Sequence, residues 1–351
     1  MSLSAEVYYH PLNFSFKAGT SRGVLTEKPS WFLKLSDGKK TGWGEVSLIS
    51  GLSPEKTTEI QGLFSRYIPV WETEGTKIID ELPADKPAFR FGWEQAIRDM
   101  ESDEPFLLYD NDFYRGKEQI PVNGLIWMGT RKDMFDQVCR KVDEGFHCIK
   151  LKIGAMDFQE ELTLLKEIRK TFSEKETELR VDANGAFSPD EATEKLKYLS
   201  EFFLHSIEQP VKPENRETLR YLSEEGAIPV ALDESLIGIN NRDEKRKLLE
   251  EVRPPYIILK PSLTGGFTGT SEWIELAENM NTGWWITSAL ESNIGLNAIA
   301  QFTNSFRPAM PQGLGTGRLF TNNIPSPLYI ENGSLGYRQG KNFDLSDLRE
   351  N

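Results

Sequence analysis

Two lysines, Lys150 and Lys152, stand one residue apart in the stretch 149–154, where branched apolar residues alternate with them. This alternation is typical of a β-strand, and it places both ammonium groups on the same face. At about 6.5 Å and an effective dielectric constant of about 20, their repulsion costs roughly 2.5 kcal/mol, or about two pKa units. Such a pair suits a lysine that must lose its proton near neutral pH and act as a base. The stretch alone is equally compatible with a solvated edge strand whose lysines prevent aggregation.

Further charged residues stand where other predicted strands end, and three of them are carboxylates: Asp182, Glu208 and Asp233. With no histidine or cysteine among them, they form a hard oxygen site, which selects Mg²⁺ or Mn²⁺ over zinc. Lys260 ends another strand, and we expect it to lie across the metal from Lys152. This geometry suits abstraction of a proton beside a substrate carboxylate, with the metal neutralising the enolate-like charge.

Each of these residues alone is more often structural than functional, and buried acids and lysines of a barrel can simply pair. Arg180 has the strand parity of Asp182 and is as compatible with a structural partner of the carboxylates as with a substrate contact. Glu234 follows Asp233 on the opposite parity, so we rank it lower as a ligand. The three histidines are scattered along the chain, which favours structural roles: His10, His147 and His205.

The elements that must position these residues recur at one period. The predicted strands end 25 to 30 residues apart, near Trp127, Lys152, Asp182, Glu208, Asp233, Lys260, Ser288 and Gly313. Eight strands at the length of a βα unit indicate a TIM-type barrel, whose active site lies at the carboxyl ends of the strands. A doubly wound open sheet is the competing fold, but the Gly-rich first turn expected of it is missing. We therefore predict a modified (β/α)7β-like barrel over residues 119–319.

Helix boundaries within the barrel have their own signals. Thr130 is a suitable N-cap, Gly145 a suitable stop, and Ser188 followed by Pro189 a helix start.

The first part of the chain has a different pattern. Residues 1–60 alternate as antiparallel strands do, interrupted by two polar loops at 19–28 and 47–53. Helical segments follow, one opening at residues 53–55 and another over 88–100. We predict an α+β capping domain over residues 1–118.

The tail from residue 320 is again strand and turn. We expect residues 320–351 to return to this N-terminal domain.

The chain of 351 residues has a formal net charge of −13, which argues against nucleic acid or an anionic membrane surface as a partner. Its two cysteines, Cys139 and Cys148, show neither metal-site spacing nor a disulfide framework. No apolar run is long enough for a membrane span. We therefore expect a cytoplasmic protein with a small-molecule carboxylate substrate. The sequence does not set the oligomeric state.

The strand-end motifs together resemble the enolase superfamily, in its muconate-lactonizing-type subgroup. The resemblance covers nearly the whole chain, and five motifs carry it in register: Lys-Leu-Lys at 150–152, Val-Asp-Ala-Asn-Gly at 181–185, Ile-Glu-Gln-Pro at 207–210, Leu-Asp-Glu-Ser at 232–235 and Leu-Lys-Pro at 259–261. Residues 42–46 and 51–55 resemble the capping domain of that family. The runs 259–266, 288–295 and 313–317 are most similar to the o-succinylbenzoate synthases.

This resemblance implies a carbon–oxygen lyase of menaquinone biosynthesis. The reaction is the syn-dehydration of 2-succinyl-6-hydroxy-2,4-cyclohexadiene-1-carboxylate to 2-succinylbenzoate. The metal ligands are those named above. Lys152 removes the α proton and returns it to the leaving hydroxyl, Lys150 lowers the pKa of Lys152, and Lys260 stays cationic and stabilises the dienolate. The two loops close over the succinyl arm, and the expected substrate contacts are Ser288, Asn184, Arg180, Gly313 and Leu52.

Other activities of the same subgroup stay open. A dipeptide epimerase and an N-acylamino acid racemase both use a lysine on each face of the substrate, and both lysines are present. The Asp-x-Asp pair of the epimerases is missing from residues 313–317, which disfavours that activity. A barrel retained without catalysis would have lost a ligand or a lysine, and none is lost.

Overall fold

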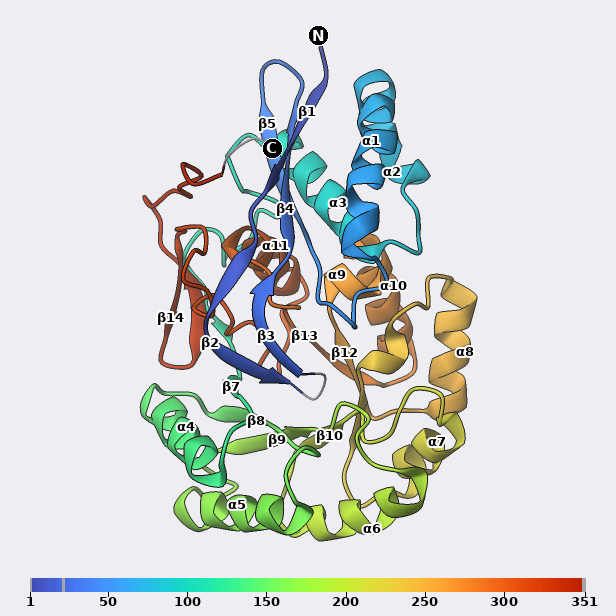
Figure 1. Cartoon of the computed structure of the whole chain (residues 1–351), viewed down its shortest axis with the longest axis vertical. Helices are drawn as coiled ribbons and strands as arrows, with labels where there is room; N and C mark the ends of the chain where they lie inside the picture. Colours follow the sequence, from blue (N-terminus) through green and yellow to red (C-terminus); the bar gives the residue numbers. More distant parts are fainter. Residues whose placement is uncertain (1, 21–22, 349–351) are drawn as a thin grey trace.

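The computed structural model of the chain describes residues 2–20 and 23–348. Figure 1 shows two parts, with strands and helices from the start of the chain at the top and a parallel sheet wrapped by helices below. We call the first part, residues 4–101, the N-terminal unit, and the second the barrel.

Seven parallel strands form the barrel sheet, and strands that are adjacent in sequence are adjacent in the sheet. They are β7 (Gly124–Ile126), β8 (Cys148–Lys152), β9 (Glu178–Asp182), β10 (Ser206–Glu208), β11 (Val230–Leu232), β12 (Tyr256–Leu259) and β13 (Gly283–Ile286). They are the first seven of the eight predicted strands, and each ends within two residues of the predicted position.

The eighth strand is reduced to a short segment around Gln312 and Gly313. Gln312 bridges Val122 beside β7, and Gly313 bridges Thr287 beside β13, both in parallel. The Gln312 carbonyl accepts from the amide of Asn123 at 2.9 Å, and the Gly313 carbonyl accepts from that of Ser288 at 3.0 Å. The segment therefore closes the barrel between its two edge strands, which confirms the (β/α)7β-like fold.

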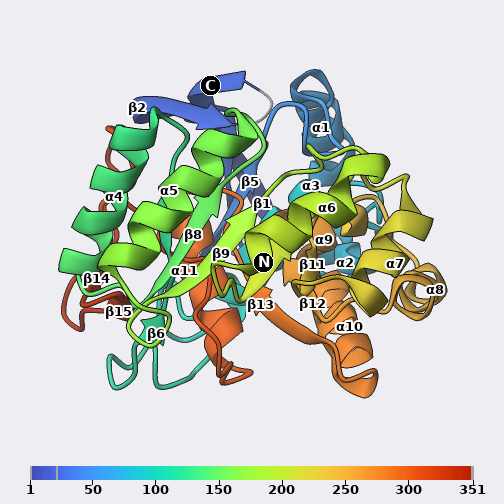
Figure 2. The same cartoon turned by 90° about the horizontal axis from the view of Figure 1, so that it is seen from below.

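Helices cover the outside of this sheet (Figures 1 and 2). They are α4 (Arg131–Asp143), α5 (Phe158–Thr171), α6 (Pro189–Ser200), α7 (Arg216–Glu225), the 3₁₀ helix η2 (Glu234–Leu236), α8 (Arg242–Val252), α9 (Pro261–Thr264), α10 (Gly266–Asn279) and α11 (Asn293–Asn304). Thr130 caps α4 through a capping box with Asp133, and Pro189 opens α6 after Ser188, as predicted. Among the residues that the structure describes, no helix has the length and apolar character that a membrane span requires.

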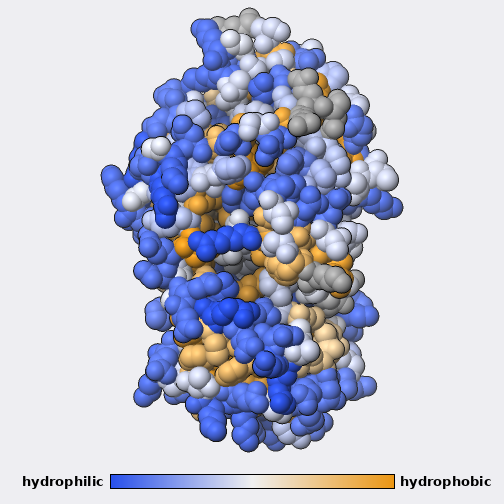
Figure 3. Space-filling view, turned by 60° about the vertical axis from the view of Figure 1, so that its left-hand side comes forward, coloured by the Kyte–Doolittle hydropathy of each residue, from blue (hydrophilic) through white to orange (hydrophobic). Residues whose placement is uncertain are grey.

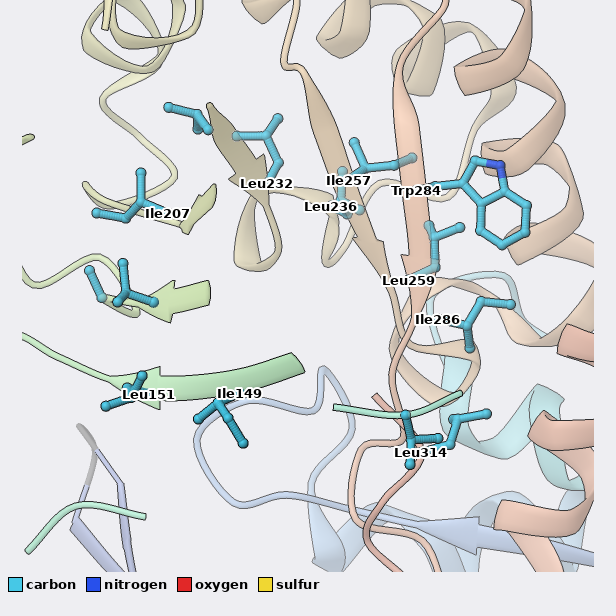
Figure 4. Packing of buried hydrophobic residues seen from close by; sticks show 14 of the residues in the cluster. Ile149, Leu151, Ile207, Leu232, Leu236, Ile257, Leu259, Trp284, Ile286 and Leu314 are labelled. Carbon is cyan, nitrogen blue, oxygen red and sulfur yellow. The ribbon is translucent and has the colours of Figure 1, made fainter. Parts of the chain in front are cut away.

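Strand alternation explains why these helices dock on the sheet. In β8 the apolar Ile149 and Leu151 belong to the core between sheet and helices, as do Ile257 and Leu259 of β12 (Figure 4). Each such side chain is fully buried, and burial of an Ile or Leu contributes about 1.5–3 kcal/mol. The residues between them face the inside of the barrel, so the packing that holds the sheet also turns the lysines of β8 inward.

The N-terminal unit has an antiparallel sheet with strand order β1-β4-β5, and its helices pack on that sheet. Its elements are β1 (Ser4–Tyr9), β4 (Ser30–Ser36), β5 (Thr41–Ser47), α1 (Thr57–Glu74), η1 (Gly75–Lys77), α2 (Ile78–Glu81) and α3 (Pro87–Glu101). Helix α3 approaches β5 so closely that a Cβ at Gly44 would stand 1.9 Å from the Gly92 carbonyl oxygen. Only glycine fits that crossing.

Two expectations for this part of the chain were wrong. Residues 19–28 do not form a loop, because they complete a hairpin of β2 (Leu12–Thr20) and β3 (Gly23–Lys28), in which Gly19 pairs with Val24 and Thr20 with Gly23. Residues 21 and 22 lie outside the described residues.

Helix α1 begins at Thr57 rather than at residue 53. Ser53 instead closes a turn on Ile49, and the Glu55 carboxylate accepts from the amides of Ala88 and Phe89 at the start of α3.

The tail divides between two neighbours. The amide of Ser15 in β2 donates to Leu319 at 2.8 Å, and that of Thr321 donates to Asn13 at 2.9 Å, so this part returns to the first strands as expected. The hairpin of β14 (Leu328–Glu331) and β15 (Ser334–Tyr337) pairs instead with β6 (Ile120–Pro121), which leads into the barrel. The domain boundaries given above stay predictions.

Candidate active site

A cavity of about 410 Å³ opens at the carboxyl ends of the barrel strands, a size that suits a small molecule. Its floor is charged and polar: Lys150, Lys152, Asp182, Asn184, Glu234 and Lys260. Its walls are mostly apolar: Val24, Leu25, Ile49, Leu52, Leu125, Trp127, Ala289 and Leu290. Figure 3 shows the molecule hollowed midway along one face, with hydrophobic side chains around the hollow and hydrophilic ones over most of the rest.

The two lysines of β8 have different partners. The Lys150 ammonium lies 3.0 Å from Asp182 Oδ2 and also contacts Glu208 Oε2. The Lys152 ammonium donates to Asn184 Oδ1 at 2.8 Å and to Asp182 Oδ2 at 3.3 Å. Lys150 is therefore fixed between two carboxylates, whereas Lys152 reaches a neutral amide and the cavity.

The predicted placement of Lys260 across the site agrees with the sheet order. Lys260 follows β12 and its ammonium contacts Asp233 Oδ2. The three strands that lead to the carboxylates, β9, β10 and β11, lie between β8 and β12. Lys152 and Lys260 thus flank the carboxylates from opposite sides.

The charges of the floor shift one another's pKa. Burial alone would lower the pKa of Lys150, but Asp182, Glu208 and Asp233 together raise it well above its usual value. Burial would raise the pKa of Asp182, yet the neighbouring ammonium groups hold it far below its usual range. Burial and the neighbouring Asp182 carboxylate raise the pKa of Glu208 well above normal. These neighbours hold Lys150 as an ammonium ion, whereas burial beside a second carboxylate favours the protonated form of Glu208.

The three carboxylates fit a divalent metal by their chemistry. They are all oxygen donors, and Glu208 Oε1 is buried and accepts no hydrogen bond. Within residues 2–20 and 23–348, however, no three acidic, histidine or cysteine side chains already converge as a metal cluster. The ammonium groups of Lys150 and Lys260 lie against oxygens of all three carboxylates.

Glu234 was ranked low on strand parity, yet it lines the cavity and Asn184 Nδ2 donates to its Oε1 at 3.0 Å. Parity holds only within a strand, and β11 ends at Leu232. Asp233 adopts φ −124° and ψ −81°, so the chain turns there into η2 and both acids reach the same end of the barrel. The adjacent Asp-Glu pair was the signal available in the sequence.

Four of the five expected substrate contacts line the cavity: Leu52, Asn184, Ser288 and Gly313. A Cβ at Gly313 would stand 2.2 Å from Thr287 Oγ1, so the residue must be glycine where the chain closes the barrel.

Arg180 is the exception and does not line the cavity. It is 1% exposed, donates to Glu178 at 2.7 Å and to the Pro311 carbonyl at 3.0 Å, and its guanidinium lies 4.3 Å from the ring centre of Trp285. The structure therefore favours the structural alternative for Arg180, one layer below the site.

Several lining residues were not found from the sequence. Trp127 and Leu125 were read only as strand residues, and Thr316 only as part of a glycine-rich loop. Thr316 shares a hydroxyl–hydroxyl hydrogen bond of 2.7 Å with Ser288. These residues line the cavity only because the barrel closes, and no local sequence pattern predicts that closure.

A family model described as enolase C-terminal domain-like matches residues 133–340, more than half of the chain. This match and the parallel barrel place the chain in that class of proteins.

Among curated proteins, an o-succinylbenzoate synthase of Desulfotalea psychrophila is 46% identical over 94% of this chain and 98% of its own. One of Escherichia coli is 26% identical over 89% of this chain and 90% of its own. The crystal structure of MenC from Desulfotalea psychrophila superimposes with a TM-score of 0.86 at 41% identity, covering 96% of this chain and all of that one. The chain therefore belongs to the enolase superfamily and, within it, to the family of o-succinylbenzoate synthases.

A dipeptide epimerase of Enterococcus faecalis, solved with Mg and a dipeptide, has a TM-score of 0.83 at 19% identity, covering 96% of this chain and 97% of that one. At that identity the likeness shows the shared fold alone.

Proposed function

We propose that this protein dehydrates 2-succinyl-6-hydroxy-2,4-cyclohexadiene-1-carboxylate to 2-succinylbenzoate, as an o-succinylbenzoate synthase of menaquinone biosynthesis. One observation carries the proposal: Lys152 and Lys260 lie on opposite sides of three carboxylates, at the floor of a cavity with apolar walls. Lys152 is placed to act as a base. The relative at 46% identity supports the substrate.

Lys152 is the base in this proposal. As a neutral amine it takes the α proton of the substrate carboxylate, the electron pair of that C–H bond forms the new C=C bond, and the C–O bond to the hydroxyl breaks. The ammonium of Lys152 then returns the proton to the departing hydroxyl, which leaves as water. Asn184 holds the Lys152 nitrogen from outside the carboxylate trio and orients it toward the cavity.

Lys260 contributes a fixed positive charge on the other side. Burial would lower its pKa, but Asp233 and Glu208 raise it, so it stays an ammonium ion. It stabilises negative charge on the substrate without moving a proton.

We propose that Asp182, Glu208 and Asp233 hold Mg²⁺, with Mn²⁺ as a substitute. When bound, the ion supplies positive charge that stabilises the negative charge developing on the substrate carboxylate. The apolar walls exclude water from these charges. We expect the enzyme to act in the cytoplasm.

The racemase alternative requires a base on each side of the reacting carbon, and Lys152 and Lys260 lie on opposite sides of the carboxylates. The test is therefore a parallel assay of the purified protein with Mg²⁺ on the cyclohexadiene carboxylate, a panel of dipeptides and a panel of N-succinylamino acids. We expect conversion of the cyclohexadiene carboxylate to 2-succinylbenzoate with the highest kcat/KM. If an N-succinylamino acid or a dipeptide is turned over and the cyclohexadiene carboxylate is not, the dehydratase proposal is wrong.

A further inference from the structure

A second group of buried charges lies between the N-terminal unit and the barrel, outside the catalytic floor. Lys28 is 2% exposed, and Glu45 and Glu291 are fully buried. Lys28 and Glu45 belong to the N-terminal unit, and Glu291 follows β13 in the barrel. We call these three residues the buried charge cluster.

Hydroxyl groups lie between Lys28 and Glu45, and Glu291 has a hydroxyl partner of its own. The Lys28 ammonium donates to Ser47 Oγ, which shares a 2.7 Å hydrogen bond with Ser30 Oγ. Glu291 Oε1 accepts from Ser262 Oγ at 2.6 Å, two residues after Lys260.

Glu45 binds the start of α11, accepting from the amides of Ser292 and Gly295 at 2.9 Å each. A carboxylate is favoured there by the helix dipole. Burial lowers the pKa of Lys28, while Glu291 and Glu45 raise it, so the three charges act on one another.

Lys28, its partner Ser47 and the third member of the cluster, Glu291, each adjoin a segment that lines the cavity. Lys28 is the last residue of β3, and that strand begins with Gly23, Val24 and Leu25. Ser47 ends β5 and leads into Ile49, Ser50 and Leu52. Glu291 directly follows Ser288, Ala289 and Leu290. The hydrogen bond between Lys28 and Ser47 therefore joins two walls of the cavity. Glu45, which accepts from Ser30 Oγ at 3.5 Å and from the amide of Ser292, connects them to the third.

The third wall has a backbone that needs such support. Leu290 has φ +62°, a left-handed conformation that an ordinary side chain adopts only when its surroundings impose it. Its amide donates to Ser288 Oγ at 2.9 Å, and the next residue is the anchored Glu291. The Leu290 side chain that lines the cavity thus depends on Glu291 for its position.

Burying these charges has a high desolvation cost, which well-packed apolar residues would avoid. We propose that Lys28 is a positioning residue for the substrate, which acts through Ser47, Glu45 and Glu291 to hold the three walls around the part of the substrate remote from Lys152. This inference rests on the proposed function for the identity of the substrate. In this inference the walls of the cavity bind the substrate, and the residues of its floor transfer the proton.

The test replaces Lys28 by methionine, which keeps the length and removes the charge. Binding lost equally in the ground state and the transition state raises KM and leaves kcat unchanged. For Lys28→Met we expect KM for the cyclohexadiene carboxylate to rise at least tenfold with kcat within about threefold of wild type. Lys28→Arg, which keeps the charge, restores most of the affinity.

Lys245 provides a matched control. It is 1% exposed and pairs with Glu272 at 2.8 Å and the Gly269 carbonyl at 2.9 Å, away from the cavity. Lys245→Met should lower the unfolding midpoint and leave KM unchanged. If Lys28→Met lowers the midpoint in the same way and its KM stays within twofold of wild type, Lys28 is merely structural and the inference is wrong.

If Lys28→Met does not fold, the pair is removed together as Lys28→Met with Glu291→Gln, which leaves neither of these two charges buried alone. An unchanged KM in that double variant contradicts the inference, and a tenfold rise supports it. A wild-type protein inactive on the cyclohexadiene carboxylate contradicts only the proposed function. The positioning role is then measured with whichever compound of the panels is turned over.

Discussion

At the scale of single residues, the two lysines of β8 differ in their chemistry because they have different partners. Lys150 is held by two carboxylates, which keep it protonated, while Lys152 has an amide partner and faces the cavity. The ammonium groups also share Asp182 Oδ2, which offsets part of the repulsion expected between them. That Lys150 lowers the pKa of Lys152 stays a prediction.

Replacing Lys152 by alanine should abolish catalysis. A positioned base contributes about 10²–10⁴-fold, so we expect kcat to fall at least a thousandfold and the exchange of the α proton with solvent deuterium to stop. Product formation and NMR exchange measure the two effects. Lys197→Ala, at an exposed position of α6, is the control and should be fully active. Dehydration in Lys152→Ala within tenfold of wild type would assign the base to another residue.

A metal at the carboxylate trio should stabilise the fold. A ligand that binds only the folded state raises stability by RT ln(1 + [L]/Kd), about 2.7 kcal/mol at a hundred times Kd. We expect Mg²⁺ to raise the unfolding midpoint of the wild type by several degrees and EDTA to reverse the shift and abolish activity. Glu208→Gln should lose most of the shift, as read by calorimetry without any substrate. An equal shift in both proteins would contradict this ligand set.

Strand parity placed Lys150, Lys152 and Asp182 on the inward face, because the rule holds along a strand. It does not apply to Glu234, which follows the end of β11. It is silent on depth for Arg180, which faces inward but below the cavity. Strand parity predicts on which face of the sheet a side chain lies. The depth of that side chain within the barrel follows only from the closed barrel.

At the scale of elements, two carboxylates of the N-terminal unit complete helices of the barrel. Glu45 of β5 accepts amides at the start of α11, and Glu94 of α3 accepts those of Phe267 and Thr268 at the start of α10, at 2.5 and 3.3 Å. The first amides of a helix have no partner within it, and a buried helix start needs an acceptor from elsewhere. The two parts of the molecule therefore share hydrogen bonds as well as apolar surface.

Substituting Glu94 by glutamine tests how much these hydrogen bonds between the two parts contribute to stability. The amide keeps an oxygen acceptor but removes the charge that the helix start and Arg90 favour, so we expect the free energy of unfolding to fall by about 1–2 kcal/mol. Urea denaturation measures the change. Glu225→Gln, an exposed glutamate at the end of α7, should alter stability by less than about 0.5 kcal/mol. Equal stability of the two variants would show that the Glu94 contact contributes nothing.

The barrel strands were predictable because their order is the order of the chain and most of them end in a recognisable motif. The hairpin of β2 and β3 was not, since the polar residues and glycines of 19–28 suggest a loop. The start of α1 was misplaced because Ser53, Pro54 and Glu55 form a good local start signal, while Glu55 is used at the start of another helix. Local signals fail where a side chain has a distant partner.

At the scale of the whole molecule, the barrel provides the chemistry and both parts provide the cavity. The charged floor comes entirely from strand ends of the barrel, while β3 and residues 49–52 of the N-terminal unit complete the walls. The motifs of the sequence could predict the floor. They could not predict the walls, because those form only when segments about 250 residues apart in the chain meet.

The stability of the whole molecule should depend on pH through Glu55. Burial raises its pKa from 4.5 to about 7. As pH rises, the unfolded chain loses this proton first, so the contribution of Glu55 to stability falls between about pH 4.5 and pH 7 and is constant above. Glu55→Gln does not titrate, so its stability relative to wild type should increase over that range, by at most about 3 kcal/mol. Urea denaturation at about pH 5 and pH 8 measures this; a constant difference would contradict the raised pKa.

The carboxylates of Glu45 and Glu94 also set an order of events during synthesis. Glu45 meets Ser292 across 247 positions of the chain, and Glu94 meets Phe267 across 173. The first strands leave the ribosome well before these partners are made. Contacts of such sequence separation form late and slowly. The N-terminal unit must therefore wait, incompletely docked, until its partners in α10 and α11 have been made, and the cavity is complete only after α11 has emerged.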